Sequence, residues 1–153
     1  MKVDIRKMTL DDLPQVIAID QVSFSLPWPE RSFRFEITDN PASRCWVIEG
    51  EGGRIIGMLV LWLIVDEAHI ATIAVHADYR RQGIGQSLLL YALKSAMEEG
   101  AISSFLEVRE SNLIAQTMYR KYGFVESGKR LHYYKDNDEN AILMSASLAN
   151  LKA

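Results

Sequence analysis

Residues 70–93 read IATIAVHADYRRQGIGQSLLLYAL, and this stretch decides the fold. The apolar, partly β-branched run over 70–75 is typical of a buried strand. A polar loop follows, and then the spacing of apolar residues predicts a helix over 83–99 that ends at Gly100. A strand that passes through a short loop into a helix is a unit of α/β sheets.

The loop between that strand and that helix has the composition of an anion site. Unpaired main-chain N–H groups at a helix start, together with the positive end of the helix dipole, bind phosphate oxygens. Two glycines would let such a ligand approach closely, and two arginines could add charge-assisted contacts. The segment reads Arg80-Arg81-Gln82-Gly83-Ile84-Gly85. An ordinary glycine-containing helix start with two solvated arginines is the alternative.

Two other phosphate motifs are excluded by the same residues. The chain has no G-x-x-x-x-G-K-[ST] segment, and the run from Gly83 to Leu88 lacks the third glycine of a dinucleotide fingerprint. NAD and ATP are therefore not the expected ligands.

The elements outside this stretch can be read from caps, turns and periodicity. A strand around Val3 and Ile5 is followed by a helix capped near Thr9 and by a second helix that begins at Pro29. The remaining expected elements are strands over 46–49 and 54–65 joined by a glycine linker, a strand over 104–108, a helix over 112–122, and two strands around the polar turn 136–139. The order β-α-α-β-β-β-α-β-α-β-β implies an α/β fold with a central mixed sheet covered by helices.

Composition sets the limits of function. The chain has 153 residues, 48% of them hydrophobic, and a formal net charge of -3, so we expect one globular domain over 1–153 with no general affinity for nucleic acid or membranes. The first six residues lack the features of a signal peptide, which favours the cytoplasm. Cys45 is the single cysteine, and its spacing from the three histidines does not suit a metal, so none is expected.

On these residues the chain resembles the GNAT superfamily of acetyltransferases. The pyrophosphate loop of that family has Gln or Arg, two residues, Gly, one residue, and Gly or Ala, which Arg80, Gly83 and Gly85 match. Segments 106–112 (LEVRESN) and 118–124 (MYRKYGF) are similar to the subgroup that acetylates protein amino termini, including a ribosomal-protein alanine. Segments 24–28 and 130–134 support that narrower match.

The resemblance covers nearly the whole chain and implies its fold and chemistry. The fold would be a GNAT-like single domain with a mixed, mostly antiparallel sheet flanked by about four helices. Acetyl-CoA would be the cosubstrate, the acceptor would be a protein or peptide amino terminus, and the protein would be a monomer or weak dimer. The amine would attack directly, without an acyl-enzyme.

The resemblance also implies roles for single residues. Glu107 would be the general base and Tyr119 the proton donor. A main-chain N–H near Ile73 or Val75 would polarise the thioester carbonyl. The cofactor-binding set would be Ile73, Ala74 and Val75 along the pantetheine arm, Arg80, Arg81, Gln82, Gly83, Ile84 and Gly85 around the pyrophosphate, and Asn112.

The residue pattern leaves structural alternatives open for the same positions. Glu107 shares one strand face with Phe105, and it could simply pair with Arg109 or with another basic residue. Asn112 could be a helix cap, and Tyr119 could be a half-buried aromatic residue.

The acceptor is encoded less clearly than the donor. Trp28, Tyr133 and Tyr134 could form aromatic walls around an extended amino terminus, with core packing as the alternative. The ribosomal enzymes commonly carry Asn where this chain has Thr72, and a proline often follows their tyrosine pair, where this chain has Lys135. A small-molecule amine acetyltransferase and a non-catalytic acetyl-CoA-binding module are therefore the competing interpretations.

Overall fold

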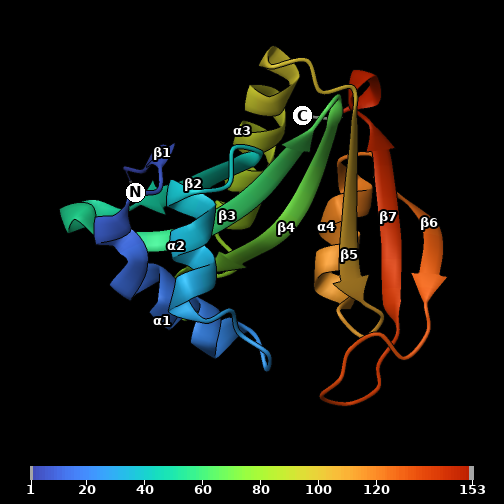
Figure 1. Cartoon of the computed structure of the whole chain (residues 1–153), viewed down its shortest axis with the longest axis horizontal. Coiled ribbons are helices and arrows are strands. Elements are labelled where there is room, and N and C mark those ends of the chain that lie inside the picture. Colours follow the sequence, from blue (N-terminus) through green and yellow to red (C-terminus); the bar gives the residue numbers. More distant parts are fainter. Residues whose placement is uncertain (1, 152–153) are drawn as a thin grey trace.

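The computed structural model describes residues 2–151, in which one seven-stranded sheet has helices on both faces (Figure 1). The strand order is β1-β2-β3-β4-β5-β7-β6, and every neighbouring pair is antiparallel except β4 with β5. The strands are β1 (Asp4–Lys7), β2 (Ser43–Glu49), β3 (Ile55–Ile64), β4 (Glu67–Val75), β5 (Ser103–Arg109), β6 (Val125–Arg130) and β7 (Ala141–Ser147).

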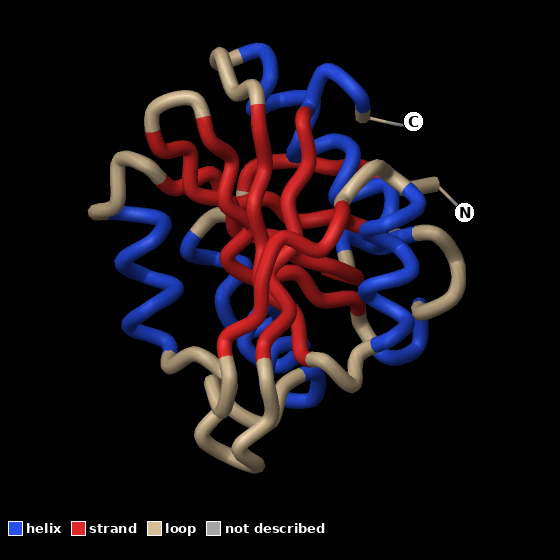
Figure 2. Tube along the Cα trace, turned by 90° about the vertical axis from the view of Figure 1, so that its right-hand side faces the viewer, coloured by secondary structure: helices blue, strands red, loops and turns tan. Residues whose placement is uncertain are grey.

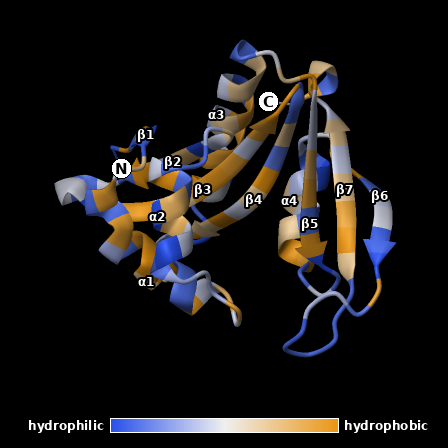
Figure 3. Cartoon of the chain, in the orientation of Figure 1, coloured by the Kyte–Doolittle hydropathy of each residue, from blue (hydrophilic) through white to orange (hydrophobic). Residues whose placement is uncertain are grey.

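Four α-helices in the described residues cover this sheet, as Figure 2 shows from the side. They are α1 (Leu13–Ser23), α2 (Glu30–Thr38), α3 (Ile84–Glu98) and α4 (Leu113–Lys121). In β3, Met58 packs with the buried residues of α1 and α2, whereas its neighbour Leu59 packs with those of α3 and α4. Successive strand residues point to opposite faces, so the sheet has a buried core on each side. Figure 3 shows the apolar strands between these layers.

The predicted α/β fold and the predicted order of helices and strands are confirmed. The helix expected over 83–99 is α3, and it ends before Gly100, which has a φ of 101°. The second strand begins earlier than expected, at Ser43, because Ser43 already pairs with Trp62 of β3. The local apolar pattern did not show this pairing.

The parallel strands β4 and β5 pair only at their amino-terminal ends. Their register runs from Glu67 opposite Ser103 to Ile70 opposite Leu106, although both strands continue beyond these residues. The divergence coincides with a β-bulge in β4, where Ala71 has no partner in the β3 register. A bulge bends its strand and disrupts the ladder locally. The carboxyl ends of β4 and β5 therefore separate, as Figure 1 shows.

Candidate active site

The start of α3 presents main-chain N–H groups beside this opening. Gly83 caps the helix with a φ of 77°, a left-handed conformation that glycine adopts without strain. Within residues 2–151, no hydrogen bond occupies the main-chain N–H groups of Gly83, Ile84 or Gly85. Together with the helix dipole, these groups provide the donors that an anion site needs.

Gly85 lies where the helix start meets the end of β4. A Cβ at this position would be 3.4 Å from Val75 Cγ2 and 3.8 Å from Met118 Sδ of α4. These are ordinary contact distances, so the first turn of α3 lies directly beside β4 and α4. The start of α3 and the strand opening are therefore adjacent.

Arg80 and Arg81, both expected near phosphate, have different surroundings. Arg80 Nε donates to the Val75 carbonyl at 3.2 Å, and Arg80 Nη2 donates to Ser23 Oγ at the end of α1 at 3.3 Å. Arg81 is exposed and has a φ of 65°, and Gln82 is exposed as well. Phosphate contacts by either arginine remain a prediction, and Arg80 would have to exchange its present bonds to make them.

The diverging part of β4 turns main-chain groups toward the opening. The N–H of His76 donates to the Ile56 carbonyl of β3 at 2.8 Å. Because successive residues alternate in direction, the N–H and C=O groups of Ala74 point toward β3, whereas those of Ile73 and Val75 point away from it. The bond from Arg80 to the Val75 carbonyl agrees with this direction. The two residues expected to polarise a thioester thus direct their main chain into the gap.

Glu107 lies on the other side of the gap, on the open face of β5. The alternation predicted for this strand is confirmed, because Leu106 and Val108 are buried and the Glu107 side chain is 33% exposed. Its carboxylate Oε1 is 3.5 Å from Arg130 Nε. Arg109, the partner weighed from the sequence, instead binds carboxylates of the loop between β6 and β7.

Asn112, which the sequence resemblance assigned to the cofactor, lies at the start of α4. Asn112 is the helix cap, and its Oδ1 accepts the N–H of Ala115 at 3.1 Å. Gln116 is buried and donates from Nε2 to the carbonyls of Arg109 and Glu110, at 3.1 and 2.9 Å. Asn112 therefore has the capping role that was the alternative, while its contact with a cofactor remains a prediction.

Tyr119 lies deeper on the same helix. Its side chain is 5% exposed, its ring centroid is 5.7 Å from that of Phe124, and burial raises the pKa of its hydroxyl, with a smaller contribution from Tyr134. Tyr122, the other tyrosine of this segment, donates its hydroxyl hydrogen to Gln86 Oε1 at 2.7 Å. The Tyr122 hydroxyl therefore has a structural partner.

The three aromatic residues expected near the acceptor have different environments. Trp28 packs against Phe33 of α2 with ring centroids 5.1 Å apart, so the packing alternative applies to it in part. Tyr133 is 43% exposed, which excludes core packing for this side chain. The partial burial of its hydroxyl, followed by the nearby Glu107 carboxylate, raises the pKa of that hydroxyl. Burial raises the pKa of Tyr134 to about 12. Its ring centroid is 4.0 Å from Arg109 Cζ.

Asp20 is a buried residue beside Trp28 that sequence reasoning missed. It is 1% exposed on α1, and its Oδ2 accepts the main-chain N–H of Trp28 at 2.8 Å. Its Oδ1 has no partner among the described residues, and burial raises the pKa of this carboxyl. The helical pattern Leu13, Val16 and Asp20 could have placed it on the buried face of α1.

Among the described residues, Cys45 and the potential metal ligands do not form a second centre. Cys45 is half-buried in β2 beside the Ser43 hydroxyl, and burial raises the pKa of its thiol. Within residues 2–151, no group of three or more His, Cys, Asp or Glu side chains is placed to hold a metal ion. None of the helices in this range is long and apolar enough to cross a bilayer.

The parallel strands separate beside a helix that begins at a glycine, with a carboxylate across the gap, and this arrangement fits a CoA-dependent acyltransferase. The family follows from comparison: residues 13–124 match the model of the Acetyltransferase (GNAT) family, and the chain belongs to that family.

Three related proteins support this assignment. A Bacillus subtilis relative is 38% identical over 143 residues, which are 94% of each chain. The crystal structure of the ribosomal-protein-S18-alanine N-acetyltransferase from Escherichia coli has a TM-score of 0.88 and 30% identity, covering 96% of this chain and 94% of that one. A Bacillus anthracis structure in complex with acetyl coenzyme A has a TM-score of 0.78 and 28% identity, covering 96% and 99%.

Proposed function

We propose that this protein transfers the acetyl group of acetyl-CoA to the α-amine of a protein amino terminus, with the amino-terminal alanine of a ribosomal protein as the first candidate acceptor. One observation carries the proposal: the gap between β4 and β5 has main-chain donors on one side and Glu107 on the other. The name of the Escherichia coli structural neighbour supports the choice of acceptor.

The donor half of the site fits acetyl-CoA. The N–H groups of Gly83, Ile84 and Gly85 would bind the diphosphate, since they are unpaired within residues 2–151 and lie at a helix start. The main chain of Ile73 and Val75 would pair with the extended pantetheine arm as a neighbouring strand would. When bound, acetyl-CoA supplies an activated acetyl group on sulfur.

The acceptor half must remove one proton and return another. The amine nitrogen bonds to the acetyl carbon, the carbon–sulfur bond breaks, nitrogen loses a proton and sulfur gains one. An α-amine has a pKa of about 8, so a partly exposed carboxylate such as Glu107 would suffice as its base, directly or through one water. Tyr119 would donate the proton to sulfur, because a buried tyrosine hydroxyl on α4 is protonated at neutral pH.

The open face of β5 favours a peptide over an enclosed small molecule. Glu107 and Tyr133 are both partly exposed there, and the loops 24–29 and 131–140 contact each other beside them. An extended chain end could enter along this face. Residues 1–153 would act as one catalytic domain in the cytoplasm, where ribosomal proteins are made.

The test offers acetyl-CoA with a panel of acceptors and measures release of free thiol. The panel contains peptides with amino-terminal Ala, Ser and Met, the same peptides with blocked amino termini, and small amines. We expect transfer to unblocked peptides, with the alanine peptide among the best acceptors.

Two outcomes would replace this proposal. Transfer only to small amines would indicate the small-molecule enzyme. Acetyl-CoA binding without transfer to any acceptor would indicate the non-catalytic module.

A further inference from the structure

We propose that Arg109 is a positioning residue for the acceptor, which assembles the acceptor site by holding loops 24–29 and 131–140 together over the open face of β5. This inference rests on the proposed function and deepens it. Arg109 follows Glu107 by two residues on β5, so both side chains lie on the same face of the sheet.

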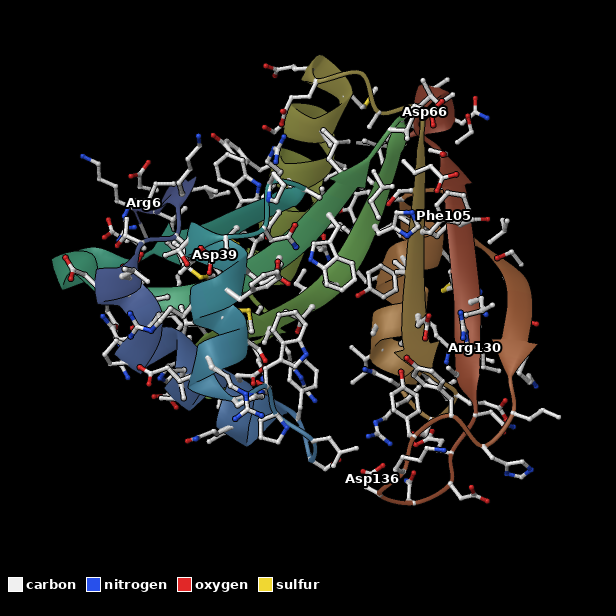
Figure 4. The ribbon with its side chains drawn as sticks, viewed as in Figure 1. Arg6, Asp39, Asp66, Phe105, Arg130 and Asp136 are labelled. Atoms are coloured by element: carbon white, nitrogen blue, oxygen red, sulfur yellow. The ribbon has the colours of Figure 1, made fainter. Side chains whose placement is uncertain are left out.

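Arg109 joins the two loops through one end of its guanidinium. Arg109 Nη2 donates to both carboxylate oxygens of Asp136, at 3.1 and 3.0 Å, and to Ser25 Oγ at 3.3 Å. The Ser25 hydroxyl also donates to Asp136. Figure 4 labels Asp136 in the loop below β5. Three elements far apart in sequence thus meet at these three side chains, which with Glu139 and Tyr134 we call the Arg109 cluster.

The other end of the guanidinium connects the loop to the donor side. Arg109 Nη1 lies 3.4 Å from Glu139 Oε1, and Glu139 Oε2 accepts the main-chain N–H of Ser111 at 2.6 Å. Ser111 immediately precedes Asn112, the cap of α4. Glu139 therefore also ties loop 131–140 to the turn that precedes α4.

The Arg109 cluster also positions the aromatic pair beside Glu107. Arg109 Cζ lies 4.0 Å from the centroid of the Tyr134 ring, and Tyr133 packs edge-on against Tyr134 with centroids 5.1 Å apart. Tyr133 in turn lies next to the Glu107 carboxylate. Moving Arg109 would displace the rings that border the general base.

Polar contacts, more than apolar burial, hold these loops. Loop 131–140 is largely hydrophilic in Figure 3, and Leu131 and Leu26 are 66% and 52% exposed. Losing Arg109 should therefore loosen the loops and leave the two buried cores intact. A planar guanidinium can pair bidentately and stack on a ring at once, which a lysine cannot do.

The experiment compares Arg109→Gln, Asp136→Asn and the double variant with wild type and with Arg44→Gln. Arg44 is the matched control, since it also donates to both oxygens of one carboxylate, Glu99, at 2.9 Å for both bonds, but joins β2 to the end of α3. The readouts are KM for the acceptor peptide, KM for acetyl-CoA, kcat, and amide hydrogen exchange of loops 24–29 and 131–140.

We expect Arg109→Gln to raise the acceptor KM by about tenfold or more, while the acetyl-CoA KM stays within about twofold. Asp136→Asn should raise the acceptor KM less. The double variant should match Arg109→Gln, because the contact between Arg109 and Asp136 is already absent in Arg109→Gln. Arg109→Lys should recover only part of the loss. Exchange should become faster in both loops with Arg109→Gln and remain unchanged with Arg44→Gln.

The inference is overturned if Arg109→Gln and Arg44→Gln have the same acceptor KM and the same loop exchange. It is also overturned if Arg109→Gln raises both KM values equally, because that indicates general destabilisation. If the wild-type protein acetylates no acceptor, the proposed function fails and the exchange measurement alone decides the role of Arg109.

Discussion

Glu107 is a third exposed on the open face of β5, whereas Tyr119 is almost entirely buried on α4. A base that takes a proton from a solvated ammonium needs access to water, whereas a tyrosine hydroxyl is already protonated at neutral pH. The two environments suit opposite proton transfers, and each residue can be tested separately.

Glu107→Gln should slow acetyl transfer mainly at low pH, where the acceptor amine is protonated. We expect the rate to fall by about tenfold or more at pH 6.5 and to stay within about threefold of wild type at pH 9. Glu110→Gln is the control. Glu110 directly follows β5, and its Oε2 lies 2.9 Å from Lys129 Nζ. Equal deficits at both pH values would remove Glu107 from proton transfer.

Tyr119→Phe keeps the ring beside Phe124 and removes only the hydroxyl. We expect kcat to fall by about 10- to 100-fold with nearly unchanged acetyl-CoA affinity, since the proton for the leaving sulfur is lost. Tyr122→Phe, which loses the bond to Gln86, should retain most activity. Full activity of Tyr119→Phe would assign the acid elsewhere.

Asp20→Asn should stabilise the protein at neutral pH. Burial raises the pKa of Asp20 above its ordinary value of 3.8, so the folded protein is penalised once the carboxyl ionises. The penalty is absent at pH values below the pKa of Asp20 in the unfolded chain. It is complete at pH values above the pKa of Asp20 in the folded protein. Asparagine cannot ionise, and its amide oxygen can still accept the N–H of Trp28.

Thermal unfolding measures this effect. At pH 7 the melting temperature should rise by roughly 2–4 °C for each kcal/mol of penalty removed, and the difference should narrow toward pH 4. A lower melting temperature for Asp20→Asn at pH 7 would contradict this account of the buried carboxyl.

At the scale of elements, the start of α3 was the part of the site most readable from sequence. A strand, a glycine-rich loop and a helix follow within residues 70–98, and local pattern suffices to predict them. The separation of β4 from β5 was not readable, because it depends on a bulge at Ala71 whose register is set by β3.

Gly83→Ala tests the helix start. Its φ of 77° would strain an alanine by about 1–2 kcal/mol, and the Kd for CoA should rise by about tenfold as the N–H groups move. Gly52→Ala in the linker between β2 and β3 is a matched control, with a φ of 71° and, like Gly83, nothing within 4 Å of an added Cβ. Gly52→Ala should lose a similar amount of stability and keep the wild-type Kd for CoA. Equal Kd values for the two variants would place the diphosphate elsewhere.

At the scale of the whole molecule, the sequence predicted the order of elements and the residues of the donor loop better than the acceptor site. The role of Glu107 was predicted from a motif. The partners of Arg109 could not be predicted in this way, because the two carboxylates lie 27 and 30 residues further along the chain and Ser25 lies 84 residues before it. Such pairings follow only from the folded sheet and loops. Arg109 shares a strand face with Glu107, and that was the one local signal of its proximity.

The most direct measurement is calorimetric titration of the purified protein with acetyl-CoA. The proposed site predicts one molecule bound per chain, with a Kd between about 1 µM and 1 mM, and displacement by free CoA. Absence of any heat of binding at about 1 mM acetyl-CoA would contradict a donor site between the diverging strands and the start of α3.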